Sequence, residues 1–416
     1  MKLYAKEKSY ELYNGDILDM KEVIKDNSID SIVCDPPYEI NFMNKGWDNS
    51  GIAFNKEAWA KCYDGLKPGG YLLAFGGTRT YHRIACAIED AGFEIRDCIM
   101  YLYGSGFPKS HNIGLSIDKK FGFPDRGHRI AMASRFHPDG TFEPNGEELS
   151  SYEAKTELGK LWQGWGTALK PAYEPIIVAR KPFKTSVAEN IMQNGVGGIN
   201  IDECRVPSTG EELGINNHTK PYGGTTINES NTPAQNSVGV ANSKRFPANV
   251  IHNGSEEAIE AMGEASRYFY CAKASRKDRD EGLEFEFSEV KTTDGCIRAN
   301  KETAREFGAN SSLRRNIHPT VKPTELMQYL VRLVSPSGAT ILDPFMGSGS
   351  TGKAVMFENR ERNADYKFIG IELTDKYLPI AKARIDYALN QYEYDAKEKE
   401  IKTGQMSLFD YKEKIK

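Results

Sequence analysis

The tetrapeptide Asp35-Pro36-Pro37-Tyr38 combines residue types that could hold an amine. It follows the apolar segment DSIVC, and open α/β sheets bind ligands at the carboxyl ends of their strands. Both prolines fix φ and lack an N–H, so this tetrapeptide, which we call the hook, is rigid and its carbonyl oxygens can accept hydrogen bonds. The Asp35 carboxylate and the Pro36 carbonyl would accept both hydrogens of an exocyclic NH2, directing its lone pair towards an electrophile, and Tyr38 would stack on the ring. The alternative is a turn that ends the strand, because Asp-Pro commonly initiates turns.

A second motif, DPFMGSGSTGK, runs from Asp343 to Lys353. Its glycines at 347, 349 and 352 match a dinucleotide-binding fingerprint, and Glu372 supplies the acidic residue after the next predicted strand. A nicotinamide-dependent oxidoreductase is therefore one interpretation. The P-loop pattern is weaker, because Ala354 follows Lys353 and has no hydroxyl for magnesium. In each case the glycines bring the backbone close to a nucleotide-like ligand and the acid binds ribose hydroxyls.

Strands and helices alternate in the first part of the chain, which indicates a parallel α/β sheet. The expected elements are a strand in DSIVCDPPY, a helix in FNKEAWAKCYDGL, a strand in GGYLLAFGG and a helix from about Thr80 to Ala91. Two later segments, IRDCIMYLYG and EPIIVARKP, are apolar and strand-like. We expect them to close the sheet as an antiparallel edge pair.

The α/β alternation stops near Lys184 and resumes at Thr324. The elements expected there are a helix in TELMQYLVRLV, a strand in GATILDPF, a helix after the glycine-rich turn, a strand in YKFIGIE and a helix in TDKYLPIAKARIDYAL. Residues 208–244 are too poor in apolar side chains to support a core, which predicts a long mobile loop inside a separate module. One α/β domain is thus built from both ends of the chain. The expected divisions are 1–183 (with a polar insertion at about 108–165), 184–315 as the insert, 316–395 as the second half of the domain, and 396–416 as a charged tail.

DPPY, together with HPTVKP at 318–323, LDPFMGSGSTG and FIGIE, resembles the beta group of DNA amino-methyltransferases, in which the catalytic half precedes the cofactor-binding half. The resemblance covers roughly residues 10–107 and 316–390, and pieces such as GFPKS and RFPANVI are similar to long-insert bacterial and phage N4/N6 methylases. It implies a Rossmann-like, seven-stranded, mostly parallel sheet that binds S-adenosylmethionine. It also implies that the insert is a target-recognition domain for double-stranded DNA.

The resemblance also implies the roles of individual residues. The catalytic hook that holds the flipped base is Asp35, Pro36, Pro37 and Tyr38. Asp16 stands where the family contacts the adenine of the cofactor, although an Asp there is also a common helix N-cap. The remaining expected cofactor contacts are Asp35, His318, Thr320, Lys322, Pro323, Asp343, Phe345, Gly347, Ser348, Gly349, Thr351 and Glu372. Lys322 as a plain surface lysine is the alternative for that position.

The residue at position 35 bears on the target base. Cytosine-N4 members of the family usually carry Ser there, so Asp35 favours N6 of adenine, with cytosine N4 as the alternative. Ser350 stands where the family usually has Thr, and this substitution retains the hydroxyl group. Cytosine-C5 methylation is disfavoured because its thiolate nucleophile needs a Pro-Cys context, and no Pro-Cys dipeptide occurs. RNA is a further possible substrate, since the hook suits any exposed adenine.

The expected mechanism needs neither a metal nor a covalent intermediate, because the sulfonium methyl of the cofactor is already activated. The protein supplies orientation, a hydrogen-bonded amine and a dry pocket, and the adenine flips out of the duplex. The seven cysteines form no CxxC pair, which argues against a structural zinc site and a disulfide framework. A DNA-binding protein without catalysis is the third class of interpretation.

The net charge of −4 provides no overall attraction to a polyanion, so DNA must be attracted locally. The richest basic stretch mixes cations with aromatics, as phosphate-contacting and base-stacking surfaces do, and supplies the candidate DNA-binding residues Arg267, Lys273, Arg276, Lys277 and Arg279. The alternative is a strand, YFYCA, followed by a solvated turn.

In the tail, Gln405 to Phe409 reads Q-x-x-L-F, which resembles the peptide that docks DNA-processing proteins on the bacterial sliding clamp. The alternative is that Leu408 and Phe409 staple the tail onto the domain. The first residues have no secretory signal and no apolar run is long enough for a membrane span, so we expect a cytoplasmic protein associated with the nucleoid, with a homodimer as one possible state.

Overall fold

The computed structural model describes residues 1–40, 46–103, 110–123, 134–136, 142–144, 153–207, 244–255, 259–260, 275–283, 290–292 and 312–391. The chain forms two compact units. One comprises Met1–Gly104 and Tyr173–Lys416, and the other comprises Ser105–Ala172. The larger unit contains every element discussed below as part of the site.

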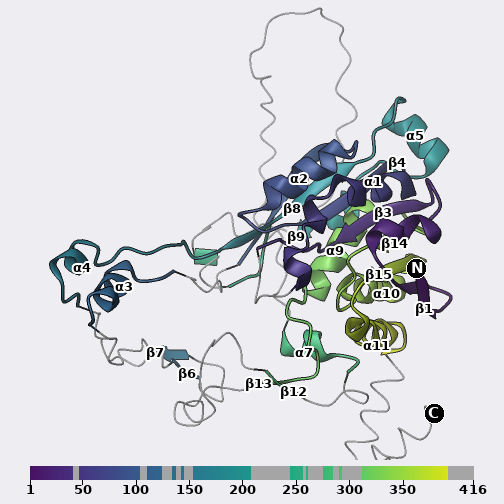
Figure 1. Ribbon diagram of the computed structural model, residues 1–416. Coiled ribbons are helices and arrows are strands. Elements are labelled where there is room, and N and C mark those ends of the chain that lie inside the picture. The colour runs from purple at the N-terminus through teal and green to yellow at the C-terminus, as the bar shows by residue number, and fades with distance from the viewer. Residues whose placement is uncertain are drawn as a thin grey trace, which may run out of the picture. The chain divides into compact units, whose positions relative to one another are not determined.

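The larger unit is built on one nine-stranded sheet (Figure 1). Its strands lie in the order β1 (Lys2–Lys6), β2 (Tyr10–Asn14), β15 (Lys367–Glu372), β14 (Thr340–Asp343), β3 (Ile29–Cys34), β4 (Leu66–Phe75), β8 (Tyr173–Arg180), β5 (Glu94–Leu102) and β11 (Val250–His252). The run from β2 to β4 is parallel, and β8 is antiparallel to both neighbours. The sheet thus has nine strands where the resemblance implied seven, with β1 and β11 at its two edges.

Helices cover both faces of the sheet. Alternate residues of β3 point to opposite faces, so Val33 joins one apolar core and Ile32 the other. The first core contains side chains of α9 (Thr324–Val334), α10 (Ser350–Arg362) and α11 (Leu378–Leu389), and the second those of η1 (Ile17–Glu22), α1 (Lys56–Gly65) and α2 (Tyr81–Asp90). Because both faces are covered, all six residues of β3 are buried.

The remaining elements are short. In the larger unit they are η3 (Gly46–Asn49), η4 (Ile52–Phe54), α5 (Val187–Asn194), η5 (Asp202–Cys204), β9 (Val206–Pro207), β10 (Lys244–Arg245), α7 (Arg276–Asp280), β12 (Val290–Thr292), β13 (Ser312–Arg314) and η7 (Asp375–Tyr377). The smaller unit contains α3 (Ile113–Lys120), β6 (Ser134–Phe136), β7 (Phe142–Pro144) and α4 (Glu157–Leu161). In the described part of the chain, no helix is long and apolar enough to cross a membrane.

The strand order creates a switch point between β3 and β14. These two strands are parallel neighbours, but the chain continues from β3 to β4 on one side and from β14 to β15 on the other. In open α/β sheets such a point leaves a crevice at the carboxyl ends of the strands. Figure 1 shows how strands from both ends of the chain, purple and yellow-green, lie side by side there.

The elements expected from the sequence are confirmed at β3, α1, β4, α2, α9, β14, α10, β15 and α11. The two apolar segments at 95–104 and 174–182 also pair antiparallel, as β5 and β8. They do not form the edge, however, because β11 pairs with the outer side of β5. The loop expected at 208–244 lies outside the described residues except for Lys244.

Candidate functional site

Asp35 directly follows β3, and Asp343 ends the neighbouring strand β14. Oδ2 of Asp35 accepts a hydrogen bond from Nζ of Lys322 at 2.7 Å. Its other oxygen, Oδ1, is buried and has no hydrogen-bond partner among the residues that the structure describes. One oxygen of Asp35 is therefore fixed, and the other is an acceptor that a ligand can use.

Glu174 is a site residue that the sequence did not single out. Oε2 of Glu174 accepts a hydrogen bond from the Tyr38 hydroxyl at 3.0 Å and lies 3.4 Å from Nζ of Lys322. The same ammonium lies 4.8 Å from the ring centroid of Phe75 and 5.2 Å from that of Tyr38. Because β8 runs against its neighbours, its first residues lie at the edge where β3 and β4 end. The reversed direction of β8 is the signal that could have identified Glu174.

The pKa values in this cluster follow from burial and the ion pair. Burial raises the pKa of Asp35 above its usual value, and the neighbouring Lys322 partly opposes that rise. Burial alone would lower the pKa of Lys322, but the carboxylates of Asp35 and Glu174 outweigh it and raise that pKa. Lys322 is therefore an ammonium ion that holds Asp35 in place, which excludes the surface-lysine interpretation.

The turn after β14 requires glycine at two positions. Gly347 and Gly349 have φ of +54° and +75°, and a Cβ at either would lie 2.9 Å from a neighbour, His318 Nε2 for Gly347 and Ala381 Cα for Gly349. The N–H of Gly347 donates to Oε2 of Glu372 at 2.8 Å, and the N–H of Thr374 donates to Oε1 at 2.7 Å. A carboxylate has about four acceptor positions, so Glu372 can still accept a hydrogen bond from a hydroxyl group.

Asp343 is buried beside this turn. Its Oδ2 accepts from the Thr351 hydroxyl at 2.5 Å and its Oδ1 from the Phe345 N–H at 3.0 Å. Burial raises the pKa of Asp343 to about 7, although both hydrogen bonds oppose the rise. The ring of Phe345 lies 5.8 Å from that of the buried Trp59, which fixes one side of the turn.

The segment before α9 brings His318 against Gly347. Nδ1 of His318 contacts the Thr320 carbonyl, and because a carbonyl only accepts, Nδ1 carries the proton. Burial lowers the pKa of His318 to about 3, so the ring is neutral at physiological pH. Pro323 immediately precedes α9, and the HPTVKP segment thus lies between the glycine turn and Asp35.

Asp16 caps a helix in this structure. Its Oδ1 accepts from the Leu18 N–H at 2.9 Å at the start of η1, as the N-cap interpretation expects. The preceding residue, Gly15, donates its N–H to the carbonyl of Glu372 at 3.1 Å. Asp16 therefore stands next to the end of β15, and a cofactor contact stays a prediction.

Two of the candidate DNA-binding side chains, Lys277 and Arg279, are described, and they differ in their surroundings. Lys277 is 84% exposed, whereas Arg279 donates from Nη2 to the His318 carbonyl at 3.0 Å. The structure therefore brings Arg279 to the HPTVKP segment. Only the backbone of Arg276 is described, and Arg267, Lys273, the YFYCA segment and the tail motif Gln405–Phe409 lie outside the described residues.

Lys353 does not behave as a P-loop lysine. Its side chain is fully buried, and Nζ donates to Oδ1 of Asp278 and to Oε2 of Glu281, both at 2.9 Å. Ser348 and Ser350 accept hydrogen bonds from the buried Arg384. Lys353 and Arg384, behind the turn, thus form hydrogen bonds within the protein.

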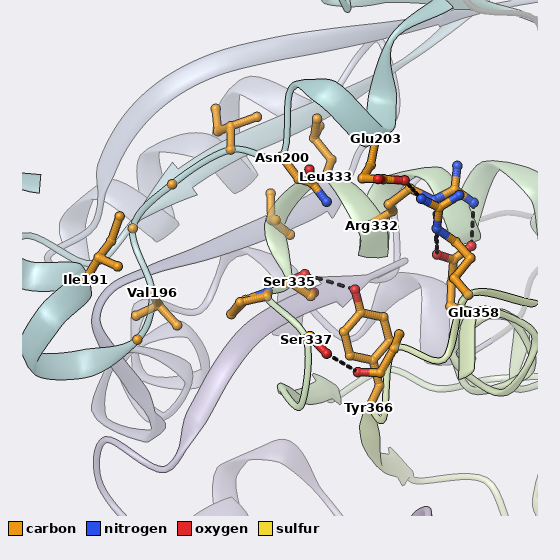
Figure 2. A pocket seen from close by; sticks show the side chains of 18 of the residues that line it. Ile191, Val196, Asn200, Glu203, Arg332, Leu333, Ser335, Ser337, Glu358 and Tyr366 are labelled. Atoms are coloured by element: carbon orange, nitrogen blue, oxygen red, sulfur yellow. Dashed lines mark hydrogen bonds and ion pairs between the residues drawn. The ribbon is translucent and has the colours of Figure 1, made fainter. Parts of the chain in front are cut away.

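A pocket of about 410 Å³ lies elsewhere (Figure 2). Ser337 and Tyr366, which line it, stand just before β14 and β15, at the ends of these strands opposite to Asp343 and Glu372. In Figure 2 the Tyr366 hydroxyl donates to the Ser335 carbonyl at 2.9 Å, and Arg332 pairs with Glu358. The pocket is separate from the candidate site.

The family described as DNA methylase, N6/N4 type, matches residues 29–383. DNA adenine methyltransferase YhdJ of Escherichia coli K12 is 38% identical over 91 residues, which are 22% of this chain and 29% of that protein. Type II methyltransferase M.HindIII of Haemophilus influenzae Rd is 24% identical over 233 residues, which are 45% of this chain and 64% of that protein. The chain thus matches less than two thirds of the length of these relatives.

A crystal structure of the M1.HpyAVI–SAM complex covers 90% of this chain and 98% of its own, at 17% identity and a TM-score of 0.38. The PvuII DNA methyltransferase, described as cytosine-N4-specific, covers 92% of this chain and 94% of its own, at 12% identity and a TM-score of 0.42.

Proposed function

This chain belongs to the N6/N4 DNA methylase family, and from that premise we propose that it transfers a methyl group from S-adenosylmethionine to N6 of adenine in double-stranded DNA. The family accounts for the DPPY hook and the glycine turn together. An oxidoreductase would leave the hook and HPTVKP without a role. A binding protein without catalysis would have little need for Asp35 beside an intact glycine turn.

The observation that carries this proposal is the unpartnered, buried Oδ1 of Asp35 at the switch point. A buried acceptor without a donor is costly, so natural proteins keep one where a ligand completes it. An exocyclic amine is such a donor. The cofactor also fits the residues present, because the turn at Gly347 and Gly349 leaves no room for a Cβ and the Glu372 carboxylate beside it can accept a further hydrogen bond.

When bound, S-adenosylmethionine supplies an electrophilic methyl group on a sulfonium. Asp35 accepts a hydrogen of the target amine at Oδ1, which orients the lone pair, and takes up the proton that the methylated amine releases. Lys322 holds Oδ2 in place meanwhile. Glu174 fixes the Tyr38 hydroxyl, so the ring is oriented before a base stacks on it. Flipping the base costs a few kcal/mol, which stacking on Tyr38 offsets.

Adenine is favoured over cytosine by Asp35, since cytosine-N4 members of the family usually carry Ser there. The similarity to a DNA adenine methyltransferase over 91 residues supports the same choice. Cytosine N4 is the second candidate, because the hook would accept either exocyclic amine.

The experiment is nucleoside mass spectrometry of DNA from a methylation-free host that expresses the protein. We expect N6-methyladenine, and its loss in Asp35→Ala while cofactor binding persists. N4-methylcytosine would agree with the family but show that cytosine, not adenine, is the target base. No modified base would contradict methylation of DNA and direct the same assay to RNA. Near-normal methylation by Asp35→Ala would remove Asp35 from the mechanism.

The same proposal includes the partners and surroundings. Residues 184–315 would recognise the target sequence. Lys277, with Arg267, Lys273 and Arg276, would contact phosphates, Gln405–Phe409 would bind the sliding clamp, and the protein would work in the cytoplasm, at the nucleoid. A clamp pull-down that survives Leu408→Ala with Phe409→Ala would exclude the docking role.

A further inference from the structure

Residues 275–283 form a short segment of the insert that is packed against the second half of the domain, and we call it the clasp. Ser275 caps α7 by accepting from the Asp278 N–H at 3.0 Å. Leu283, at the other end, is fully buried and packs with Tyr377, Ile380 and Ala383. The clasp is therefore anchored to α11 by an apolar contact.

Asp278 occupies the centre of the clasp. Its Oδ2 accepts the N–H of Thr324 at 3.0 Å and its Oδ1 accepts the Thr324 hydroxyl, so both oxygens hold the first residue of α9. Oδ1 also lies 2.9 Å from Nζ of Lys353 and 3.8 Å from Nη2 of Arg384. Thr324 is two residues after Lys322, so Asp278 fixes the backbone next to the lysine that pairs with Asp35.

The neighbours of Asp278 fix the other end of the HPTVKP segment. Oδ1 of Asp280 accepts the Asn316 N–H at 3.0 Å, and the Arg279 carbonyl accepts from Nδ2 of Asn316 at 2.9 Å. Nη2 of Arg279 donates to the His318 carbonyl at 3.0 Å. The clasp thus holds residues 316–324 at both ends.

The clasp also reaches the glycine turn. Nη2 of Arg384 donates to the Asp278 carbonyl at 3.2 Å, and its Nη1 donates to the Ser348 carbonyl at 2.7 Å. Lys353, in the first turns of α10, donates to the same Asp278 carbonyl at 3.0 Å. The two elements expected to enclose the cofactor therefore share one buried attachment point.

We propose that Asp278 is a positioning residue for the S-adenosylmethionine site, holding the HPTVKP segment in register with the glycine turn through Thr324, Lys353 and Arg384. This inference rests on the proposed function. In this role Asp278 acts through Thr324 and the backbone that carries Lys322, and not through a contact of its own with cofactor or base. The segment predicted to contact DNA phosphates is, at Asp278 and Arg279, an internal support of the cofactor site.

Charge compensation alone does not explain these contacts. Lys353 and Arg384 are fully buried cations that need anionic partners. Glu281 already pairs with Lys353 at 2.9 Å, and the structure gives no contact between Glu281 and Thr324. The two carboxylates therefore share the task of neutralising Lys353, but the attachment of Thr324 belongs to Asp278. This difference provides a matched control.

The test compares Asp278→Ala/Lys353→Met with Glu281→Ala/Lys353→Met in the full chain. Each double variant removes one carboxylate together with Lys353, so neither leaves a buried lysine uncompensated. In the Asp278 variant, Glu281 and Asp280 still compensate the charge of Arg384. Two quantities are measured: hydrogen exchange of the ligand-free protein over residues 316–324, and the Kd for S-adenosylmethionine by calorimetry. We expect the Asp278 variant alone to exchange faster in this segment and to bind roughly tenfold more weakly.

Equal exchange and equal Kd in the two folded variants would overturn the inference. If the Asp278 variant does not fold, Thr324→Val is measured instead, because it removes only the hydroxyl contact. A Kd unchanged from wild type in Thr324→Val would then overturn the inference, and a weaker Kd would support it. Absence of binding by the wild-type protein would instead refute the proposed function, a result that the first calorimetric measurement distinguishes.

Discussion

Lys322 places its ammonium 2.7 Å from Oδ2 of Asp35, although the two residues are 287 positions apart in the chain. Asp35 follows β3 in the first half of the domain, and Lys322 precedes α9 in the second. The ion pair joins the two halves at the carboxyl edge of the sheet. Since Lys322 is 10% exposed and Asp35 21%, solvent screens this pair less than a surface pair.

Replacing Lys322 by Met should raise the pKa of Asp35 further, because the ammonium opposes the rise that burial causes. A smaller fraction of Asp35 is then ionised at a given pH, so the acidic limb of the kcat/KM profile for methyl transfer should move to higher pH. The pH profile of both proteins measures this shift. Lys8→Met, at an exposed lysine between β1 and β2, is the control and should leave the profile unchanged. An acidic limb at the wild-type position in Lys322→Met would contradict the coupling.

Replacing Gly347 by Ala should weaken cofactor binding roughly tenfold or more. The new Cβ would lie 2.9 Å from Nε2 of His318, which must then leave the turn. Gly338→Ala is the matched control, because Gly338 also has positive φ, +78°, but has open space around its Cβ position. In both variants, Ala at positive φ costs about 1–2 kcal/mol of stability, which lowers the melting temperature. A Kd equally affected in both would show that strain alone acts.

The sequence predicted the mostly parallel sheet and the two acidic strand ends, because these depend on local periodicity and turn chemistry. It did not identify Glu174, whose position depends on the reversed direction of β8. That direction is decided by pairing between β8, β4 and β5, which no local pattern reports. Arg279 was expected at a DNA surface because it belongs to a basic stretch of the sequence. Its hydrogen bond to the His318 carbonyl depends on tertiary packing, which the local sequence does not reveal.

Replacing Tyr38 by Ala should lower kcat/KM for DNA, whereas Tyr38→Phe should retain most of it. A stacked base is worth about 1–3 kcal/mol, which corresponds to roughly 5- to 150-fold. The Phe variant keeps the ring and loses only the hydroxyl bond to Glu174. Steady-state kinetics with a flippable duplex measures both variants, with the Kd for the cofactor as the check on folding. Equal losses in the two variants would mean that the hydroxyl, not the ring, is the functional group.

Replacing Asp343 by Asn should stabilise the ligand-free protein at pH 8 and weaken cofactor binding. Burial raises the pKa of Asp343 to about 7, from an ordinary value of 3.8. Between these values the folded state binds a proton that the unfolded state has released, so this group's contribution to stability is full below pH 4 and is lost as the pH rises to about 7. The loss at pH 8 is about 4 kcal/mol.

The Asp343→Asn variant would avoid that loss, because the new amide can accept from the Phe345 N–H and donate to the Thr351 hydroxyl in the places that the carboxylate now uses. The melting temperature of Asp343→Asn relative to wild type should therefore rise between pH 5 and pH 8. Binding should weaken, because Asp343 is a predicted cofactor contact and the ammonium of S-adenosylmethionine attracts a carboxylate. A melting-temperature difference that stays constant with pH would mean that Asp343 ionises at its ordinary pKa in the folded protein.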